Sequence, residues 1–202
     1  MKTKIIEKSS ELFLTLGFKS VTMDDISSAL GVSKKTLYAH FENKTALVTA
    51  VTSNMFVVIS EGIDHICALG KNPIEELYDI KRFVMRVLKD EKASPQFQLK
   101  KYYPKIYEEV KKKQFSVMQS CIQDNLHRGI AMKLYRDTID VSFIARIYFH
   151  GMIGIKDAEL FPLVKFSMNT LMEHYLEYHL RGICTPEGIH ILAQEIQTPI
   201  KK

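Results

Sequence analysis

Residues 22–41 contain, in close succession, a helix start signal, a glycine turn and a second helix start signal. Thr22 followed by Asp25 is a capping-box pattern, which predicts that a helix begins directly after Thr22. Gly31 tolerates the left-handed backbone of a sharp turn, and Ser33 is suited to cap a second short helix. Two short helices joined in this way cannot bury their apolar sides alone. The segment therefore requires further helices to pack against.

The remaining sequence predicts helices almost from end to end. Capping residues or prolines begin each segment, glycines end many of them, and apolar residues recur between them at helical spacing. We expect helices over residues 5–16, 23–31, 33–40, 43–69, 73–93, 104–129, 137–154 and 162–181, with a short piece before Pro104 and a last helix from about Thr185. No run alternates apolar and polar residues between turn signals, so nothing predicts a sheet.

The expected fold is therefore all-α, with about nine or ten helices in two parts. An N-terminal three-helix helix-turn-helix head, residues 1–48, precedes a larger C-terminal helical bundle, residues 49–202. The boundary is expected inside the fourth helix, near residues 44–50. A chain of 202 residues is long enough for a small module fused to a larger one.

Composition limits the function only weakly. The apolar fraction is 46% and the charged fraction 25%, which is ordinary for a globular protein. A net charge of +5, from 28 basic and 23 acidic residues, permits a polyanionic partner without requiring one. No uninterrupted apolar run approaches the roughly 18 residues of a membrane span, and the N-terminal residues lack the apolar stretch of a signal peptide.

Cysteine usage points to a reducing compartment. Cys67, Cys121 and Cys184 are odd in number, far apart in sequence and without a CxxC pair. This pattern predicts free, buried thiols rather than disulfides. We therefore expect a cytoplasmic protein that has no membrane partner.

Packing the two short helices decides which side chains face outward. The residues expected to pack on each other and on Phe13 and Leu16 are Ile26, Ala29, Leu30, Val32, Leu37 and Phe41. The residues left facing outward are Ser33, Lys34, Lys35, Thr36, Tyr38 and His40. Thr22 and Lys44 lie at helix N-termini, which favour phosphate because their backbone N–H groups are free. Spacing alone fits a DNA-groove reader and a hairpin with a merely solvated basic end equally well.

Residue identity separates these two alternatives. The segment resembles the N-terminal domain of the TetR (AcrR-like) family of bacterial transcriptional regulators. The matching residues are Ser10, Leu12-Phe13, Gly17-Phe18, Val21-Thr22, Ile26-Ser27, Leu30-Gly31-Val32-Ser33, Thr36-Leu37-Tyr38-Ala39-His40-Phe41, Asn43-Lys44 and Leu47. They cover about the first 50 residues, whereas the rest of the chain resembles the family only as a helical bundle of suitable length.

The resemblance implies that the segment from Ser33 to His40 is a recognition helix lying in the major groove of double-stranded DNA. Lys34, Lys35 and Thr36 are then the candidates for base edges or adjacent phosphates. The candidates for phosphate contacts, which fix register without reading sequence, are Tyr38, His40, Thr22 and Lys44. Position 35 is commonly a small residue in the family, so the contact made by Lys35 is expected to differ.

The C-terminal helices are rich in methionine and aromatic residues, which at helical spacing usually fill a core. The resemblance implies a second role, in which a small-molecule effector binds between these helices and moves the DNA heads. The candidate ligand-binding residues are Phe83, Tyr103, Tyr107, Met118, Gln119, Cys121 and His150. Nothing in the sequence identifies the effector, or establishes that one exists.

Residues 138–154 and 162–181 are apolar on more than one helical face, which exceeds what the outer helices of a monomer need. We expect a homodimer interface there, and the resemblance implies a four-helix bundle. A two-fold dimer would bind a palindromic operator. Together these features predict a ligand-responsive repressor of transcription. A transcriptional activator would show the same sequence pattern.

Two alternatives from other classes remain. An enzyme is disfavoured, since no nucleophile–base pair, glycine-rich phosphate loop or useful carboxylate pair is present. Neither a metal site nor a cofactor is expected, because His174 and His179 are wrongly spaced to share a ligand face. A scaffold that has kept the head but lost DNA binding is the other alternative. It would lack the steep salt dependence of phosphate contacts.

Overall fold

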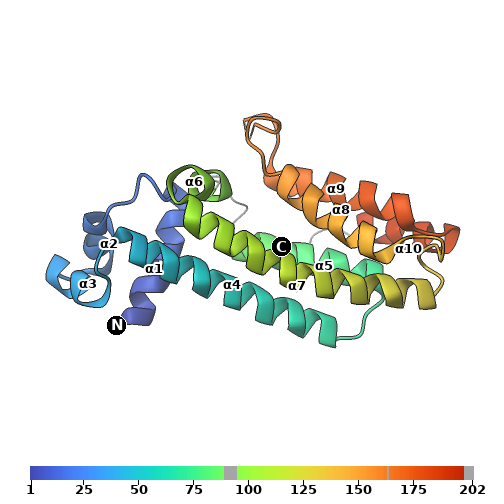
Figure 1. Cartoon of the computed structure of the whole chain (residues 1–202), viewed down its shortest axis with the longest axis horizontal. Helices are drawn as coiled ribbons and strands as arrows, with labels where there is room; N and C mark the ends of the chain where they lie inside the picture. Colours follow the sequence, from blue (N-terminus) through green and yellow to red (C-terminus); the bar gives the residue numbers. More distant parts are fainter. Residues whose placement is uncertain (89–94, 163, 198–202) are drawn as a thin grey trace.

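The computed structural model describes residues 1–88, 95–162 and 164–197. Over these ranges the chain is all-α, as predicted. Its helices are α1 (Lys2–Leu16), α2 (Met23–Leu30), α3 (Lys34–His40), α4 (Lys44–Ala68), α5 (Pro73–Val87), α6 (Pro95–Tyr102), α7 (Pro104–Ala131), α8 (Val141–Gly154), α9 (Met168–Ile183) and α10 (Pro186–Gln197). The molecule is elongated, with α1–α3 at one end and α8–α10 toward the other (Figure 1).

The helix starts predicted from local sequence are confirmed where a capping side chain was identified. The Asp25 N–H donates to Thr22 Oγ1 at 3.1 Å while Asp25 Oδ2 accepts from the Thr22 N–H at 2.8 Å, which completes the capping box. Ser33 and Asn43 cap α3 and α4 through their side chains alone, which accept from the Thr36 and Ala46 N–H groups at 3.1 and 2.9 Å. Gly31 has φ 65°, which is the left-handed backbone expected at the turn.

Other predicted boundaries were wrong. The helix expected from residue 137 begins at Val141, because the Asp140 carboxylate accepts from the Phe143 N–H at 3.0 Å and caps the helix there. The helix expected over 162–181 is Met168–Ile183, because Ser167 rather than Pro162 supplies the cap. The helix expected over 73–93 ends at Val87, and residues 89–93 lie outside the described part of the chain.

The head packs around a core that includes Phe13, Ile26, Leu37 and Phe41, as the sequence predicted. Leu16 was expected in this core but is 55% exposed, because it is the last residue of α1, where the chain turns away. Ala29 is also exposed, because Met23, Ile26 and Ser27 form the buried face of α2 and residue 29 falls outside that face.

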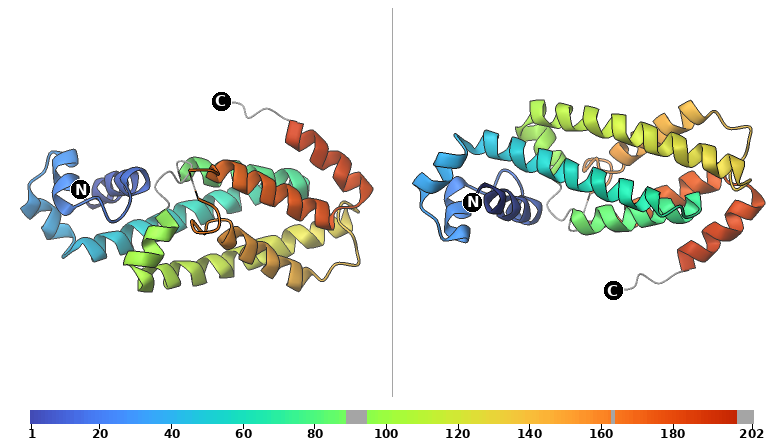
Figure 2. Two further views of the ribbon diagram at one scale, coloured as in Figure 1. Left: turned by 90° about the horizontal axis from the view of Figure 1, so that it is seen from above. Right: turned by 90° about the horizontal axis from the view of Figure 1, so that it is seen from below.

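Helix α4 connects the two parts of the molecule. It packs against α1 in the head and against α5 and α7 in the bundle (Figures 1 and 2). By length and composition it is long and apolar enough to cross a membrane, a feature that a search for an uninterrupted apolar run missed. Only 28% of its most apolar window is buried. Val57 and Val58 are exposed, at 49% and 42%, whereas Phe56, Ile59 and Ile63 line a cavity in the bundle, which explains their apolar character.

Helices α4 and α7 bring together two cysteines that are far apart in sequence. The Sγ atoms of Cys67 and Cys121 lie 3.8 Å apart, and both thiols are free. Burial raises the pKa of both thiols, so the protonated forms are favoured. Free thiols were predicted, but their proximity was not.

Candidate DNA-binding surface and internal cavity

Helix α3 lies at the tip of the molecule, at the end remote from α8–α10 (Figures 1 and 2). Leu37 is fully buried and fixes the helix to the head. The opposite side of α3 exposes Lys34, Lys35, Tyr38 and His40, with Tyr38 49% exposed. The fold therefore presents a row of polar and basic side chains at its extremity, where a large partner can approach.

The two lysines that begin α3 are in different electrostatic environments. Lys34 Nζ lies 2.6 Å from Asp24 Oδ2, and this hydrogen-bonded carboxylate raises the pKa of Lys34. Lys35 forms no ion pair with any residue that the structure describes. Lys35 is accordingly the lysine of α3 whose charge is most available to a polyanion.

Several other candidate DNA contacts already have partners within the head. The Thr22 hydroxyl donates to Asp25 Oδ2 at 2.7 Å. Ser33 Oγ and Thr36 Oγ1 are 2.8 Å apart. Lys44 Nζ donates to the Lys19 carbonyl at 3.3 Å, and burial lowers the pKa of Lys44. A phosphate that binds these groups would have to share or replace these hydrogen bonds.

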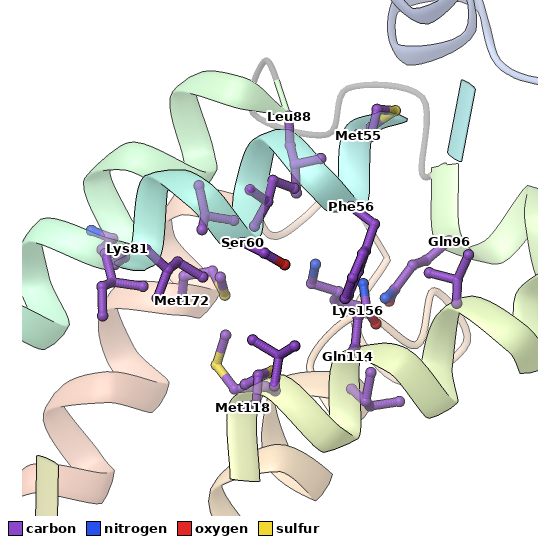
Figure 3. A pocket seen from close by; sticks show the side chains of 18 of the residues that line it. Met55, Phe56, Ser60, Lys81, Leu88, Gln96, Gln114, Met118, Lys156 and Met172 are labelled. Atoms are coloured by element: carbon purple, nitrogen blue, oxygen red, sulfur yellow. The ribbon is translucent and has the colours of Figure 1, made fainter. Parts of the chain in front are cut away.

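A cavity of about 200 Å³ lies inside the bundle, where α4, α5, α7, α8 and α9 converge and α6 covers one end (Figure 3). Its wall is mainly aliphatic and methionine side chains. Met118 and Cys121, two of the residues proposed from sequence, belong to this wall. The cavity is large enough for a small molecule, since about 150 Å³ suffices for benzene in an engineered apolar cavity.

The structure places the other proposed ligand residues elsewhere. Phe83 lies across Gly62, where an added Cβ would come within 2.0 Å of its ring. Tyr103 and Tyr107 belong to the head core. Gln119 is partly buried and does not belong to the cavity wall. Its side-chain N and O have no hydrogen-bond partner among the described residues. His150 is exposed on α8.

The sequence reasoning missed most of the cavity wall. Missed residues include Phe56, Ser60, Gln96, Gln114, Lys156 and Met172. Part of this set had a readable signal, because Phe56, Ile59, Ser60 and Ile63 recur at helical spacing along one face of α4. Gln96 and Lys156 lie in or beside short connecting segments, where no periodicity marks the inward side.

The cavity and the head share part of their packing. Phe18 and Leu99 line the cavity and also belong to the head core. On α6, Gln98 Oε1 accepts from the Lys19 N–H at 3.0 Å, and the Gln98 side chain packs on Gly17. A change in the cavity that moved α6 would therefore act directly on the turn between α1 and α2.

Helices α8 and α9 leave an exposed stripe on the side away from the bundle core. On α8 the stripe contains Phe143 and Ile147, which are 58% and 45% exposed. On α9 it contains His174 and Tyr178, the latter 76% exposed. These positions recur at i and i+4, so they lie on one face of each helix, and no other residue in the described part of the chain covers that face.

Comparison with known proteins gives a consistent match to the head. Residues 5–51 match the family described as bacterial regulatory proteins, tetR family. IcaR of Staphylococcus epidermidis, a negative transcriptional regulator of the biofilm operon icaADBC, is 38% identical over 56 residues, which cover 28% of this chain and 30% of that protein.

Longer matches extend over the bundle. YerO of Bacillus subtilis, an uncharacterized HTH-type transcriptional regulator, is 24% identical over an alignment of 218 positions. The alignment covers 97% of this chain and 75% of that protein. The regulatory protein TetR from Rhodobacter sphaeroides superposes with a TM-score of 0.70 at 16% identity, covering 90% of this chain and 97% of that chain. The whole fold, and not only the head, therefore has counterparts among transcriptional regulators.

Proposed function

We propose that this chain, a helix-turn-helix DNA-binding transcriptional regulator of the TetR family, acts as a homodimeric, ligand-responsive repressor on a palindromic operator. The family resemblance drawn from residues 10–47 is confirmed by the matched domain at residues 5–51. The matched family consists of regulatory proteins, which is consistent with the prediction that the chain is not an enzyme. A soluble bacterial regulator that binds DNA belongs in the cytoplasm, where its operator is.

The observation that carries the proposal is the exposed basic face of α3 at the tip of the molecule. On this proposal residues 1–48 form the DNA-binding domain, and residues 49–202 bind an effector and dimerise. Lys35 then reads the groove, Lys34 contacts bases or phosphates after leaving Asp24, and Lys44 contacts phosphate. Repression is supported by IcaR, which is described as a negative regulator.

The exposed stripe of α8 and α9 supports a dimer. Aromatic and aliphatic side chains such as Phe143, Ile147 and Tyr178 are unfavourable in water when they form a continuous face. A second copy turned by two-fold symmetry would cover both stripes at once and place two α3 helices on one DNA duplex. Protein symmetry would then require a palindromic or near-palindromic site.

The test begins with a DNA site selected from a random pool, followed by fluorescence anisotropy on that duplex and on a random duplex. We expect binding that falls steeply with salt and prefers the selected duplex by at least about a thousandfold. Lys44→Ala should weaken binding to both duplexes and reduce the salt slope by about one. Lys35→Ala should instead change which sequence is preferred.

Lys165→Ala is a matched control, because Lys165 is exposed in the connection between α8 and α9, far from α3 along the molecule. It should bind both duplexes like the unmodified protein. Equal losses on both duplexes for every head variant would argue against groove reading. Binding without salt dependence, or no binding at all, would favour the scaffold alternative.

A further inference from the structure

Helices α4 and α7 hold two thiols in van der Waals contact beside the cavity. Cys67 lies in the last turn of α4 and Cys121 in the middle of α7, and their Sγ atoms are 3.8 Å apart. Cys121 also belongs to the cavity wall. A disulfide requires the two sulfurs to be about 2 Å apart, so each sulfur has to move by about 1 Å. A modest rotation about the Cα–Cβ bond of each cysteine supplies that movement.

Polar contacts hold the two helices together at this point. One turn after Cys121, the buried Asn125 amide donates to the Pro73 carbonyl at 2.9 Å. Arg128 Nη1 donates to the Lys71 carbonyl at 3.3 Å. Both contacts join α7 to the segment that follows α4. The two thiols are therefore held close to each other, which gives each a high effective concentration toward the other.

We propose that Cys67 and Cys121 form a reversible disulfide when a low-molecular-weight disulfide accumulates, and that this bond ties α4 to α7 at the wall of the cavity. Disulfides in reducing compartments are usually transient or redox-sensing, which agrees with free thiols in the resting protein. Helix α4 also carries Leu47, Val48 and Val51 of the head core, so a bond at its far end links the redox state to the head. That regulatory consequence rests on the function proposed above, whereas the disulfide itself does not.

The bond forms by two displacements, with oxidised glutathione as the example. The thiolate of Cys67, the less enclosed of the two thiols, attacks one sulfur of oxidised glutathione and releases one glutathione thiolate. The thiolate of Cys121 then attacks the Cys67 sulfur of the mixed disulfide and displaces the second glutathione. The two cysteine protons end on the two released glutathione molecules. The cysteine pair loses two electrons, and oxidised glutathione gains them.

Burial of the two thiols has opposite effects on rate and equilibrium. It raises the pKa of both, and the exchange is slow at neutral pH because the thiolate is the attacking form. Thiolate formation stabilises the reduced state of strongly oxidising pairs, and this reduced pair lacks that stabilisation. The disulfide is therefore favoured at equilibrium, although it forms slowly.

The experiment equilibrates the full chain at about pH 8, without oxygen, in mixtures of reduced and oxidised glutathione. The protein is then quenched in acid, unfolded, treated with N-ethylmaleimide and weighed by mass spectrometry. We expect three adducts per chain in dithiothreitol and one adduct as oxidised glutathione comes to predominate. Peptide mapping should join Cys67 to Cys121, and dithiothreitol should restore all three adducts.

Three serine variants locate the bond. Cys67→Ser and Cys121→Ser should form no intramolecular disulfide. Cys184→Ser is the matched control, because it removes the buried thiol outside the pair, and it should still form the disulfide. Circular dichroism checks that each variant is folded. The peptide map of the unmodified protein locates the bond even where a variant is not.

Three adducts at every glutathione ratio, a mixed disulfide that never resolves, or a bond to Cys184 would each overturn the proposed pair. Fluorescence anisotropy on the selected duplex then compares the reduced and oxidised proteins. We expect the two DNA affinities to differ at least about fivefold, and the difference to vanish in Cys67→Ser. If the disulfide forms and DNA affinity is unchanged, the bond stands and its regulatory consequence fails. If the reduced protein binds no DNA, the proposed function fails and the disulfide stands.

Discussion

The backbone N–H and the hydroxyl of Thr22 both donate hydrogen bonds to Asp25 Oδ2 within the capping box. These hydrogen bonds lower the pKa of Asp25. Replacing Thr22 with alanine removes the acceptor for the Asp25 N–H, so we expect Thr22→Ala to lower the free energy of unfolding by about 1 kcal/mol. Urea denaturation measures this loss.

Thr22→Ser should retain most of the stability, because serine offers the same oxygen. Thr45→Ala is the matched control: Thr45 is exposed in the first turn of α4, where its hydroxyl does not cap the helix. Its effect should stay within about 0.5 kcal/mol. If Thr22→Ala were as mild as Thr45→Ala, the capping box would not be stabilising the head.

His179 provides a residue-scale prediction about pH. The ring is 7% exposed and lies against Tyr148, with ring centroids 4.8 Å apart, and burial lowers its pKa from 6.5 to about 4. The unfolded chain therefore binds the proton more readily than the folded one. Stability should be intact above pH 6.5 and fall as the pH drops toward 4, by about 2 kcal/mol between pH 7 and 5.

Urea denaturation at both pH values measures the slope. His179→Gln should remove this part of the pH dependence whatever its effect at pH 7. His127→Gln, at an exposed position of α7, should leave the slope unchanged. An unaltered slope in His179→Gln would show that other groups cause the acid sensitivity.

At the residue scale, the sequence predicts what depends on near neighbours. The caps at Thr22, Ser33 and Asn43 each involve a backbone N–H three residues further on, so a local pattern suffices. Which aromatic residue faces the cavity depends instead on how distant helices meet. Phe83 has the same side chain as Phe56, yet of these two residues Phe56 alone lines the cavity.

At the element scale, α6 connects the bundle to the head through Gln98. Gly17 has φ 88°, and a Cβ placed there would lie 2.2 Å from the Gln98 amide. We expect Gly17→Ala to be destabilising by about 1–2 kcal/mol from backbone strain, with a further loss from the clash with Gln98. Gln98→Ala should cost less, about 1 kcal/mol, for the lost hydrogen bond to the Lys19 N–H.

Gly17→Ala combined with Gln98→Ala completes a double-mutant cycle, measured by urea denaturation. The double variant should be more stable than the sum of the single losses predicts, because the clash disappears while the strain remains. Additive losses would mean that α6 and the turn before α2 are not in contact in solution.

The element scale also shows why helix existence was easier to predict than helix boundaries. Apolar periodicity indicated the segments that became α8 and α9, but several polar residues near each start were able to cap. Asp140 caps α8 in preference to Asp137, and Ser167 caps α9 instead of the turn at Pro162. Tertiary packing selects among such candidates, and the sequence pattern does not contain that information.

At the scale of the whole molecule, the proposed dimer links the uncovered face of α8 and α9 to DNA binding at the other end. On the proposed function each head alone would offer DNA one short helix, because α3 has only 7 residues. Two heads held by one dimer bind the second half-site at high effective concentration. Loss of the dimer should therefore reduce operator affinity far more than it reduces the affinity of each chain for random DNA.

We expect the double variant Phe143→Glu with Tyr178→Glu to be monomeric at micromolar concentration by light scattering, because four buried carboxylates would face one another in a two-fold interface. Its affinity for the selected duplex should fall at least about a hundredfold. Leu69→Glu is the control, since Leu69 is 55% exposed just after α4 and lies outside the stripe, and it should remain dimeric. A double variant that stays dimeric would place the interface elsewhere, whereas a monomeric unmodified protein would remove the symmetry argument for a palindromic operator.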